Sequence, residues 1–143
     1  MKTNVFDVAN YILLQTGQIT TMKLQKLLYY CQAWSLVWDE KPLFPEEIQA
    51  WANGPVVPEL YNAHRGFFEV VRFKIGDAVK VQGEAKETID KVLEAFADKP
   101  AKWLIDLTHL ESPWIDARAG LGSNDRSNVV ITKEAMFDYY SSL

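Results

Sequence analysis

The sequence has few of the residues from which disulfides and metal centres are built. It contains one cysteine and two histidines among 143 residues. A disulfide within the chain is therefore excluded, and a dedicated zinc site is not expected. The cysteine, Cys31, lies in an apolar run, which predicts a small buried side chain and not a reactive thiol. We expect neither a metal nor a cofactor.

Long apolar runs and an excess of basic residues are also missing. No window approaches the ~20 apolar residues that a membrane-spanning helix needs, and residues 1–7 contain no hydrophobic signal core. We therefore expect a cytoplasmic protein with no membrane partner. The 15 Lys and Arg are outnumbered by 19 Asp and Glu, for a net charge of −4. Because binding to a phosphate backbone depends on clustered positive charge, nucleic acid is not expected as the main partner.

The chain does contain enough apolar residues to build a core. Hydrophobic residues make up 48% and charged residues 24% of the sequence, a balance typical of globular proteins. The length predicts one domain over residues 1–143. Apolar residues recur mainly at helical spacing, which predicts helices over about 4–17, 58–66, 84–97, 100–110, 112–120 and from 132 onward. The predicted fold class is mainly α, a compact helical bundle.

The centre of this bundle is predicted to be a helix over about 22–38. Thr20 or Thr21 can cap its start, and its apolar residues cover nearly every side, as in a fully buried helix. Lys23, Gln25 and Lys26 are polar exceptions in the opening turns. Each lysine could face a carboxylate or a ligand, but solvation is the simpler interpretation and we favour it.

One hairpin is predicted, over about 70–81, and residues 43–51, whose apolar residues alternate loosely, could be a short strand or an irregular turn of helix. Val71, Phe73 and Ile75 alternate with polar residues, and a second alternation follows the next glycine. An isolated hairpin is only marginally stable. It should therefore lie on the helical body or pair with residues 47–51.

Residues 51–61 form a stiff segment with a glycine and two prolines. Asn53-Gly54 is a turn dipeptide, and Pro55 and Pro58 each fix φ near −65°. Pro58 suits the first position of a short helix. The segment could be a shaped rim of a binding surface beside the turn that carries the two lysines. It could equally be a joint that only orients the helix containing Tyr61.

A catalytic alternative rests on Asp106 and His109, which are three positions apart and can share a helix face. Ser112 or Glu111 could complete a hydrolase-like set. However, the sequence contains no nucleophile-elbow motif and no phosphate-binding glycine loop. We therefore favour a structural role, in which His109 ties a helix end to its neighbour, and we do not expect an enzyme.

Two long motifs resemble a known family. They are residues 21–30 (TMKLQKLLYY) and 50–61 (AWANGPVVPELY), followed by Leu107-Thr108-His109, Ser112-Pro113-Trp114 and a capped terminal helix. Together they resemble the Panacea domain of bacteria and their phages, also described as SocA-like or phage GepA-like. The resemblance covers nearly the whole chain.

The resemblance implies an antitoxin that neutralises the toxin encoded beside it by direct protein binding. It also implies, for some members, delivery of the toxin to a cellular protease. We expect no added DNA-binding region, and therefore no control of its own operon. We also expect no disordered tail that wraps a toxin, so neutralisation should use folded surfaces.

On this interpretation the partner-binding candidates are Lys23, Lys26, Trp51, Asn53, Gly54, Pro55 and His64. The remaining motif residues are expected to be structural: Leu24, Gln25, Leu27, Tyr29, Tyr30, Val56, Pro58, Tyr61, His109, Pro113 and Trp114. A third alternative, a phage-derived regulator associated with nucleic acid, requires one positive face made of Lys23, Lys26, Arg65, Arg72 and Lys74.

Overall fold

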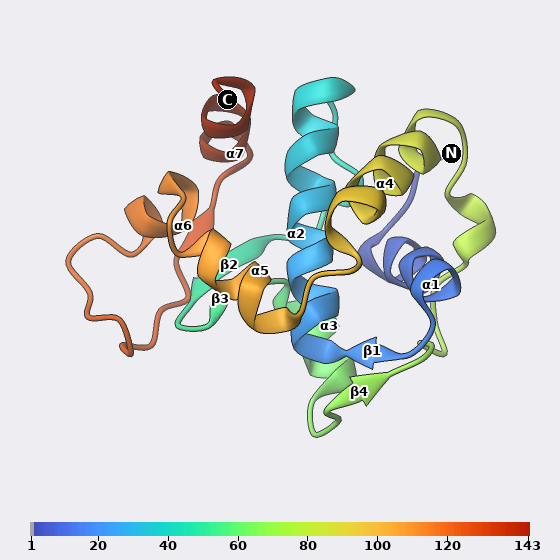
Figure 1. Ribbon diagram of the computed structural model, residues 1–143, viewed down its shortest axis with the longest axis horizontal. Coiled ribbons are helices and arrows are strands. Elements are labelled where there is room, and N and C mark those ends of the chain that lie inside the picture. The colour runs from blue at the N-terminus through green and yellow to red at the C-terminus, as the bar shows by residue number, and fades with distance from the viewer. Residues whose placement is uncertain (1) are drawn as a thin grey trace.

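A computed structural model describes residues 2–143 (Figure 1). The elements are α1 (Val5–Thr16), β1 (Ile19–Thr20), α2 (Thr21–Trp38), β2 (Ile48–Trp51), β3 (Gly54–Val56), α3 (Pro58–His64), β4 (Glu69–Val70), the 3₁₀ helix η1 (Ala78–Lys80), α4 (Gly83–Phe96), α5 (Ala101–Thr108), α6 (Ser112–Ala117), β5 (Val130–Ile131) and α7 (Lys133–Ser141). The fold is mainly α, as predicted. Within the described residues, no helix has both the length and the apolar character needed to cross a bilayer.

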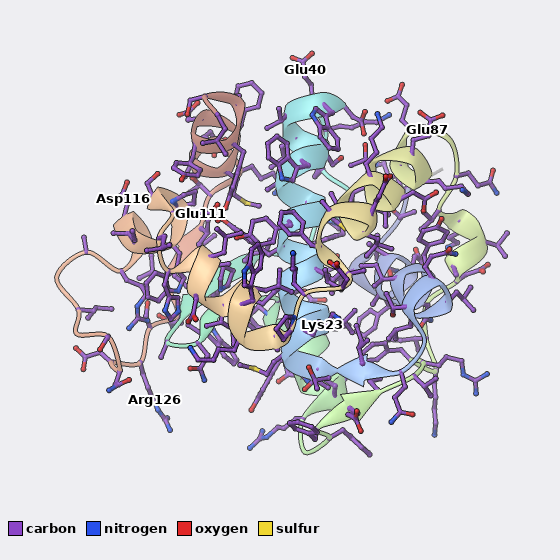
Figure 2. All side chains as sticks on the ribbon, viewed as in Figure 1. Lys23, Glu40, Glu87, Glu111, Asp116 and Arg126 are labelled. Carbon is purple, nitrogen blue, oxygen red and sulfur yellow. The ribbon has the colours of Figure 1, made fainter. Side chains whose placement is uncertain are left out.

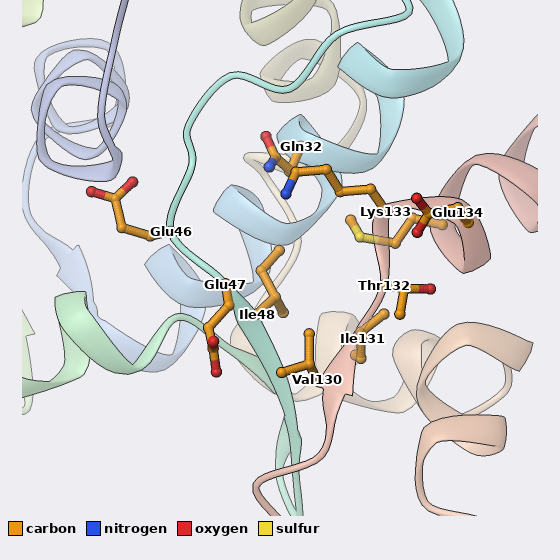
Figure 3. Close-up of a pocket in the computed structure, with 10 residues that line it drawn as sticks. Gln32, Glu46, Glu47, Ile48, Val130, Ile131, Thr132, Lys133 and Glu134 are labelled. Carbon is orange, nitrogen blue, oxygen red and sulfur yellow. The ribbon is translucent and has the colours of Figure 1, made fainter.

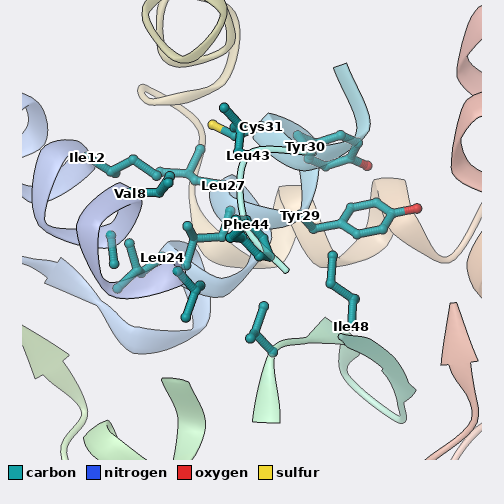
Figure 4. Packing of buried hydrophobic residues seen from close by; sticks show 14 of the residues in the cluster. Val8, Ile12, Leu24, Leu27, Tyr29, Tyr30, Cys31, Leu43, Phe44 and Ile48 are labelled. Carbon is teal, nitrogen blue, oxygen red and sulfur yellow. The ribbon is translucent and has the colours of Figure 1, made fainter. Parts of the chain in front are cut away.

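The predicted central helix is confirmed as α2, which begins at Thr21 and is capped by the Thr20 side chain. It runs through the middle of the molecule and packs against α1, α4, α5 and α7 (Figure 1). Leu24 and Leu27 are fully buried beside Val8 and Ile12 of α1, at the centre of one apolar cluster (Figure 4). An all-round apolar helix is stable only where neighbours cover every side, which is why the other helices surround it.

The next residues of α2 carry a buried hydrogen-bond network on the side opposite α1 (Figure 4). Tyr30 and Tyr140 both donate to Oε1 of Glu111, at 2.6 and 2.7 Å. Tyr140 and Tyr29 lie 2.9 Å apart through their hydroxyls. Burial raises the pKa of the Glu111 carboxyl. The Tyr29-Tyr30 motif therefore links the central helix to α7 and to the residue just before α6.

The predicted hairpin over 70–81 is wrong. The one strand that reaches this range is β4, which ends at Val70 and pairs antiparallel with β1 (Ile19 with Val70, Thr20 with Glu69). The following backbone is bound to α1, because the Asn10 side chain accepts from Phe73 N at 2.9 Å and donates to three carbonyls of residues 73–76. One buried amide therefore satisfies backbone groups that a hairpin would have paired with each other. Phe73 is buried against Phe6, which explains its apolar character.

The hairpin of this fold lies instead at residues 48–56. β2 pairs antiparallel with β3 (Ala50 with Pro55, Trp51 with Gly54) and, on its other edge, with β5. The predicted turn forms one residue earlier than Asn53-Gly54, at Ala52-Asn53, and Gly54 begins β3 at φ +107°. Pro58 opens α3, also as predicted. Four of the eleven residues of the predicted connector, Trp51 and Gly54–Val56, are therefore in strands, and residues 58–61 are in α3.

Candidate partner-binding site

The β2–β3 hairpin is held from beneath by two polar side chains of α2. The Lys26 ammonium nitrogen Nζ donates to the Pro55 carbonyl at 3.0 Å. Gln25 accepts from Val57 N at 2.8 Å and donates to Val57 O at 3.3 Å. The polar residues near the start of α2 therefore face the protein. The predicted solvation of Lys26 is wrong, because the hairpin covers it.

Lys26 is 0% exposed, and its hydrogen bond goes to a neutral carbonyl. Burial lowers the pKa of its amine from 10.5 to about 7, since a charge without an opposite charge is disfavoured in a poorly solvated site.

Gly54 of the hairpin lies directly against the Lys26 side chain. A Cβ at Gly54 would lie 2.6 Å from Lys26 Cε and 3.0 Å from Thr108 Oγ1, so glycine is required both for its positive φ and for this close approach.

Two side chains from α6 and its C-terminal end hold the other strand of the hairpin. Trp114 Nε1 donates to Trp51 O at 2.8 Å, and Arg118 Nη1 donates to Ala50 O at 2.9 Å. The Arg118 guanidinium also donates to the carbonyls of Gly122 and Asp125, which fixes the following loop. Sequence reasoning missed Arg118. Its only signal was a position four residues after Trp114, where its guanidinium also lies over the indole at 5.1 Å.

The residues of the hydrolase alternative do not converge. His109 stacks on Trp114 with ring centroids 3.9 Å apart, whereas Asp106 pairs with Lys102 at 2.8 Å and Glu111 accepts from the buried tyrosines. Burial lowers the pKa of His109, and the charge of Lys26 adds to this effect. The ring nitrogen Nε2 of His109 is buried without a hydrogen-bond partner in residues 2–143. This nitrogen therefore makes no hydrogen bond to Ser112 or to either carboxylate.

An open groove of about 1060 Å³ lies in front of the hairpin. Its walls come from the first turns of α2, the hairpin, the C-terminal end of α3, residues 66–68 and residues 126–128. Trp51 and Tyr61 meet edge to face at 4.9 Å, and Tyr61 meets His64 in the same way at 5.4 Å. These three rings form a continuous aromatic wall.

His64 is fixed at the inner end of this wall. Its Nε2 lies 3.0 Å from Nε2 of Gln25, and only 5% of the residue is exposed. Burial lowers the pKa of the His64 imidazole, and the charge of Lys26 lowers it further. A neutral imidazole can accept a hydrogen bond from the Gln25 amide, so the groove wall and the hairpin support share one side chain.

The partner-binding candidates therefore divide into two groups. Asn53 is exposed and Trp51 is partly exposed, and both line the groove. Lys26, Gly54, Pro55 and His64 are buried, so they lie under the surface or at its inner edge, where they hold the hairpin in shape. Lys23 is partly exposed but donates to the Ala97 carbonyl at the end of α4, and it does not line the groove.

The positive face required by the nucleic-acid alternative does not form as predicted. It needed five exposed basic residues, but Lys26 is buried and Lys23 is bound to the end of α4. Arg65, Arg72 and Lys74 remain exposed. Figure 2 shows Lys23 near the middle of the view and Arg126 at its lower left, on the loop that precedes β5.

A smaller hollow of about 240 Å³ lies between β2, β5 and the start of α7 (Figure 3). Glu46 and Glu134 stand on opposite sides of it (Figure 3). Glu46 accepts from Val5 N at 3.0 Å, and Glu47 accepts from the Gln49 amide at 2.7 Å. These carboxylates serve local hydrogen bonds and do not converge on a common point.

Comparison with known proteins gives one result. The family model described as "Antitoxin SocA-like, Panacea domain" matches residues 24–115, more than half of the chain. The matched region contains most of α2, the hairpin, the aromatic wall and Trp114. Neither the curated proteins nor the solved structures gave a match.

Proposed function

The chain belongs to the SocA-like, Panacea-domain antitoxin family, and we propose that it neutralises a cognate toxin by binding it directly through the hairpin and its groove. The observation that carries this proposal is the construction of the hairpin. Side chains of α2, Trp114 and Arg118 bind its backbone at Ala50, Trp51 and Pro55, and Gln25 of α2 also binds Val57, the residue directly after it. A surface ordered before binding loses little conformational entropy when a partner docks.

Trp51 and Asn53 are the candidates best placed for direct contact, because they lie on the hairpin and line the groove. Tryptophan is enriched among the residues that dominate binding energies. Lys26, Gly54 and Pro55 act by keeping these two residues in position. The family's motifs then contain residues that contact the toxin and residues that hold the contacting residues in place.

Coexpression with the product of the adjacent gene tests this function. We expect the antitoxin to restore growth of cells that express the toxin, and the two proteins to elute together in size-exclusion chromatography. Trp51→Ala should weaken the complex by at least ~30-fold, as expected for a hot-spot residue. If the unmodified protein neither rescues growth nor forms a complex, the proposed function is wrong.

Neutralisation can follow from blocking the toxin or from delivering it to a protease, and toxin lifetime separates these modes. After synthesis is stopped, a blocked toxin should persist in complex with the antitoxin. A delivered toxin should disappear faster when the antitoxin is present, and it should be stabilised in cells that lack the protease. We propose blocking as the minimal mode, since it requires only one binding surface.

A further inference from the structure

The groove in front of the hairpin has a charge opposite to that of the chain as a whole. The chain carries a net charge of −4, yet the residues that line the groove include Arg65 and Arg126 and no aspartate or glutamate. Neither arginine forms an ion pair with a carboxylate within residues 2–143. Two arginines are therefore available to carboxylates from outside, with which they can form charge-assisted and bidentate hydrogen bonds.

The groove also presents two exposed aromatic side chains on a fixed backbone. Phe67 and Phe68 are 68% and 75% exposed. Their backbone is nevertheless bound, because Phe67 N donates to His64 O and Thr21 N donates to Phe68 O, both at 2.9 Å. The Thr21 hydroxyl lies 3.3 Å from both phenylalanine carbonyls. These rings are therefore held out toward solvent by the fold, an arrangement typical of interaction surfaces.

We propose that this groove binds an acidic segment of the toxin that carries at least one aromatic or large aliphatic side chain. Carboxylates of the segment bind Arg65 and Arg126. Its apolar side chain packs between the exposed Phe67–Phe68 pair and the wall formed by Trp51 and Tyr61. This inference rests on the proposed antitoxin function and names the chemistry of the partner at that site.

Arginine beside aromatic rings also suits single-stranded nucleic acid, whose bases stack on such rings. Two observations favour the acidic protein segment. The net charge of the chain is −4, which repels a phosphate backbone that continues past the groove, whereas a short acidic segment can place its carboxylates inside the groove alone. The basic residues outside the groove also fail to extend the positive patch, because Lys26 is buried and Lys23 is bound to the end of α4.

Calorimetric titration of the toxin into matched variants tests the proposal. The charge variant is Arg65→Glu with Arg126→Glu, and its control is Lys80→Glu with Lys133→Glu, which changes the net charge equally on exposed residues outside the groove. The apolar variant is Phe68→Ser, and its control is Leu110→Ser, where the leucine is 76% exposed and does not line the groove. Thermal melting of each variant establishes that it is folded.

We expect both groove variants to bind at least ~30-fold more weakly than the unmodified protein, and both controls to bind within ~3-fold of it. Binding by the unmodified protein should weaken as salt is added, whereas binding by the charge variant should not, since its two glutamates repel the acidic segment and salt screens this repulsion. Replacing acidic residues of the toxin segment by lysine should restore binding to the charge variant.

The outcomes separate this inference from the function on which it rests. A complex that forms equally well with the groove variants overturns the groove and leaves the antitoxin function standing. Failure of the unmodified protein to bind the toxin overturns both. Tight binding of a single-stranded oligonucleotide that is lost in the same groove variants also overturns the proposal, since it assigns the groove to nucleic acid.

Discussion

The buried Lys26 should make the stability of this protein depend on pH in a window where few other groups titrate. Burial lowers the pKa of its amine from 10.5 to about 7 in the folded protein. Between these values the unfolded chain holds a proton that the folded protein has released. Because the unfolded state binds more protons there, the free energy of unfolding rises with pH through this window.

The size of the effect follows from the two pKa values. A fall from 10.5 to about 7 corresponds to about 5 kcal/mol over the full window, at about 1.4 kcal/mol per pKa unit. Near pH 7 the folded amine is only partly protonated, so the gain between pH 7 and pH 9 is about 2 kcal/mol. The contribution of Lys26 to the free energy of unfolding should be lowest below pH 7, where its amine is charged in both the folded and the unfolded state.

Urea unfolding at pH 7, 8 and 9 provides the assay, and Lys26→Met provides the comparison. Methionine has a similar length and no charge, so the rise of about 2 kcal/mol should disappear in this variant. It will leave the Pro55 carbonyl without its donor, which costs about 1–3 kcal/mol at every pH. The pH slope is therefore a cleaner readout than the stability at one pH.

Lys23→Met is the matched control, because Lys23 lies three positions earlier and is partly exposed. It should leave the slope unchanged. Subtracting the curve of Lys26→Met from that of the unmodified protein also removes contributions from Cys31, whose thiol pKa is raised by burial. A flat difference between pH 7 and pH 9 would refute the reasoning, since it would mean that Lys26 stays charged and solvated in the folded state.

Three further predictions concern the supports of the fold. Gly54→Ala should lower the free energy of unfolding by about 2 kcal/mol or more in urea titrations, because the new Cβ meets Lys26. Gly66→Ala, at φ +90° in open space, should cost only about 1 kcal/mol of backbone strain. Glu111→Gln should destabilise the protein by about 1–3 kcal/mol in thermal melts, since the two tyrosine hydroxyls lose a charged acceptor. Asn10→Ala should speed amide hydrogen exchange at Phe73, whose N–H it leaves unpaired, while exchange in α2 changes little.

The helices could be predicted from the sequence because the signals that define them are local. The Asn4 capping box with Asp7, the caps at Thr20 and Thr132, and Pro58 at the start of α3 all act within a few residues. The spacing of apolar residues also predicts which side of each helix is buried. The all-round apolar character of α2 was sufficient to place it at the centre of the bundle.

The strands could not be predicted in the same way, because partners for extended segments come from elsewhere in the chain. Alternation at residues 70–81 suggested a hairpin, but Asn10 of α1 binds residues 73–76. The hairpin formed at residues 48–56, which overlap the 51–61 segment that Pro55 and Pro58 suggested to be a connector. Whether a segment pairs as a strand depends on which donors and acceptors the fold brings beside it.

The candidate site was likewise predictable only in its local features. Motif and spacing identified the segment from Trp51 to Tyr61 and the lysines near the start of α2, but not which of these side chains reach the surface. Lys23 and Lys26 are both lysines near the start of α2. Lys23 is bound to the end of α4, whereas Lys26 lies under the hairpin. Arg118 and the exposed Phe67–Phe68 pair gave almost no sequence signal of a role.

By itself, then, the sequence determined the helices, the central position of α2 and the antitoxin family, since caps, periodicity and ordered motifs are properties of neighbouring residues. Only the tertiary structure decided that Lys26 supports the hairpin, that Gly54 must be glycine, and that an aromatic groove with two free arginines opens beside it. Those features depend on atoms brought together from residues 21–128, and packing alone sets which of them are covered and which remain in solvent.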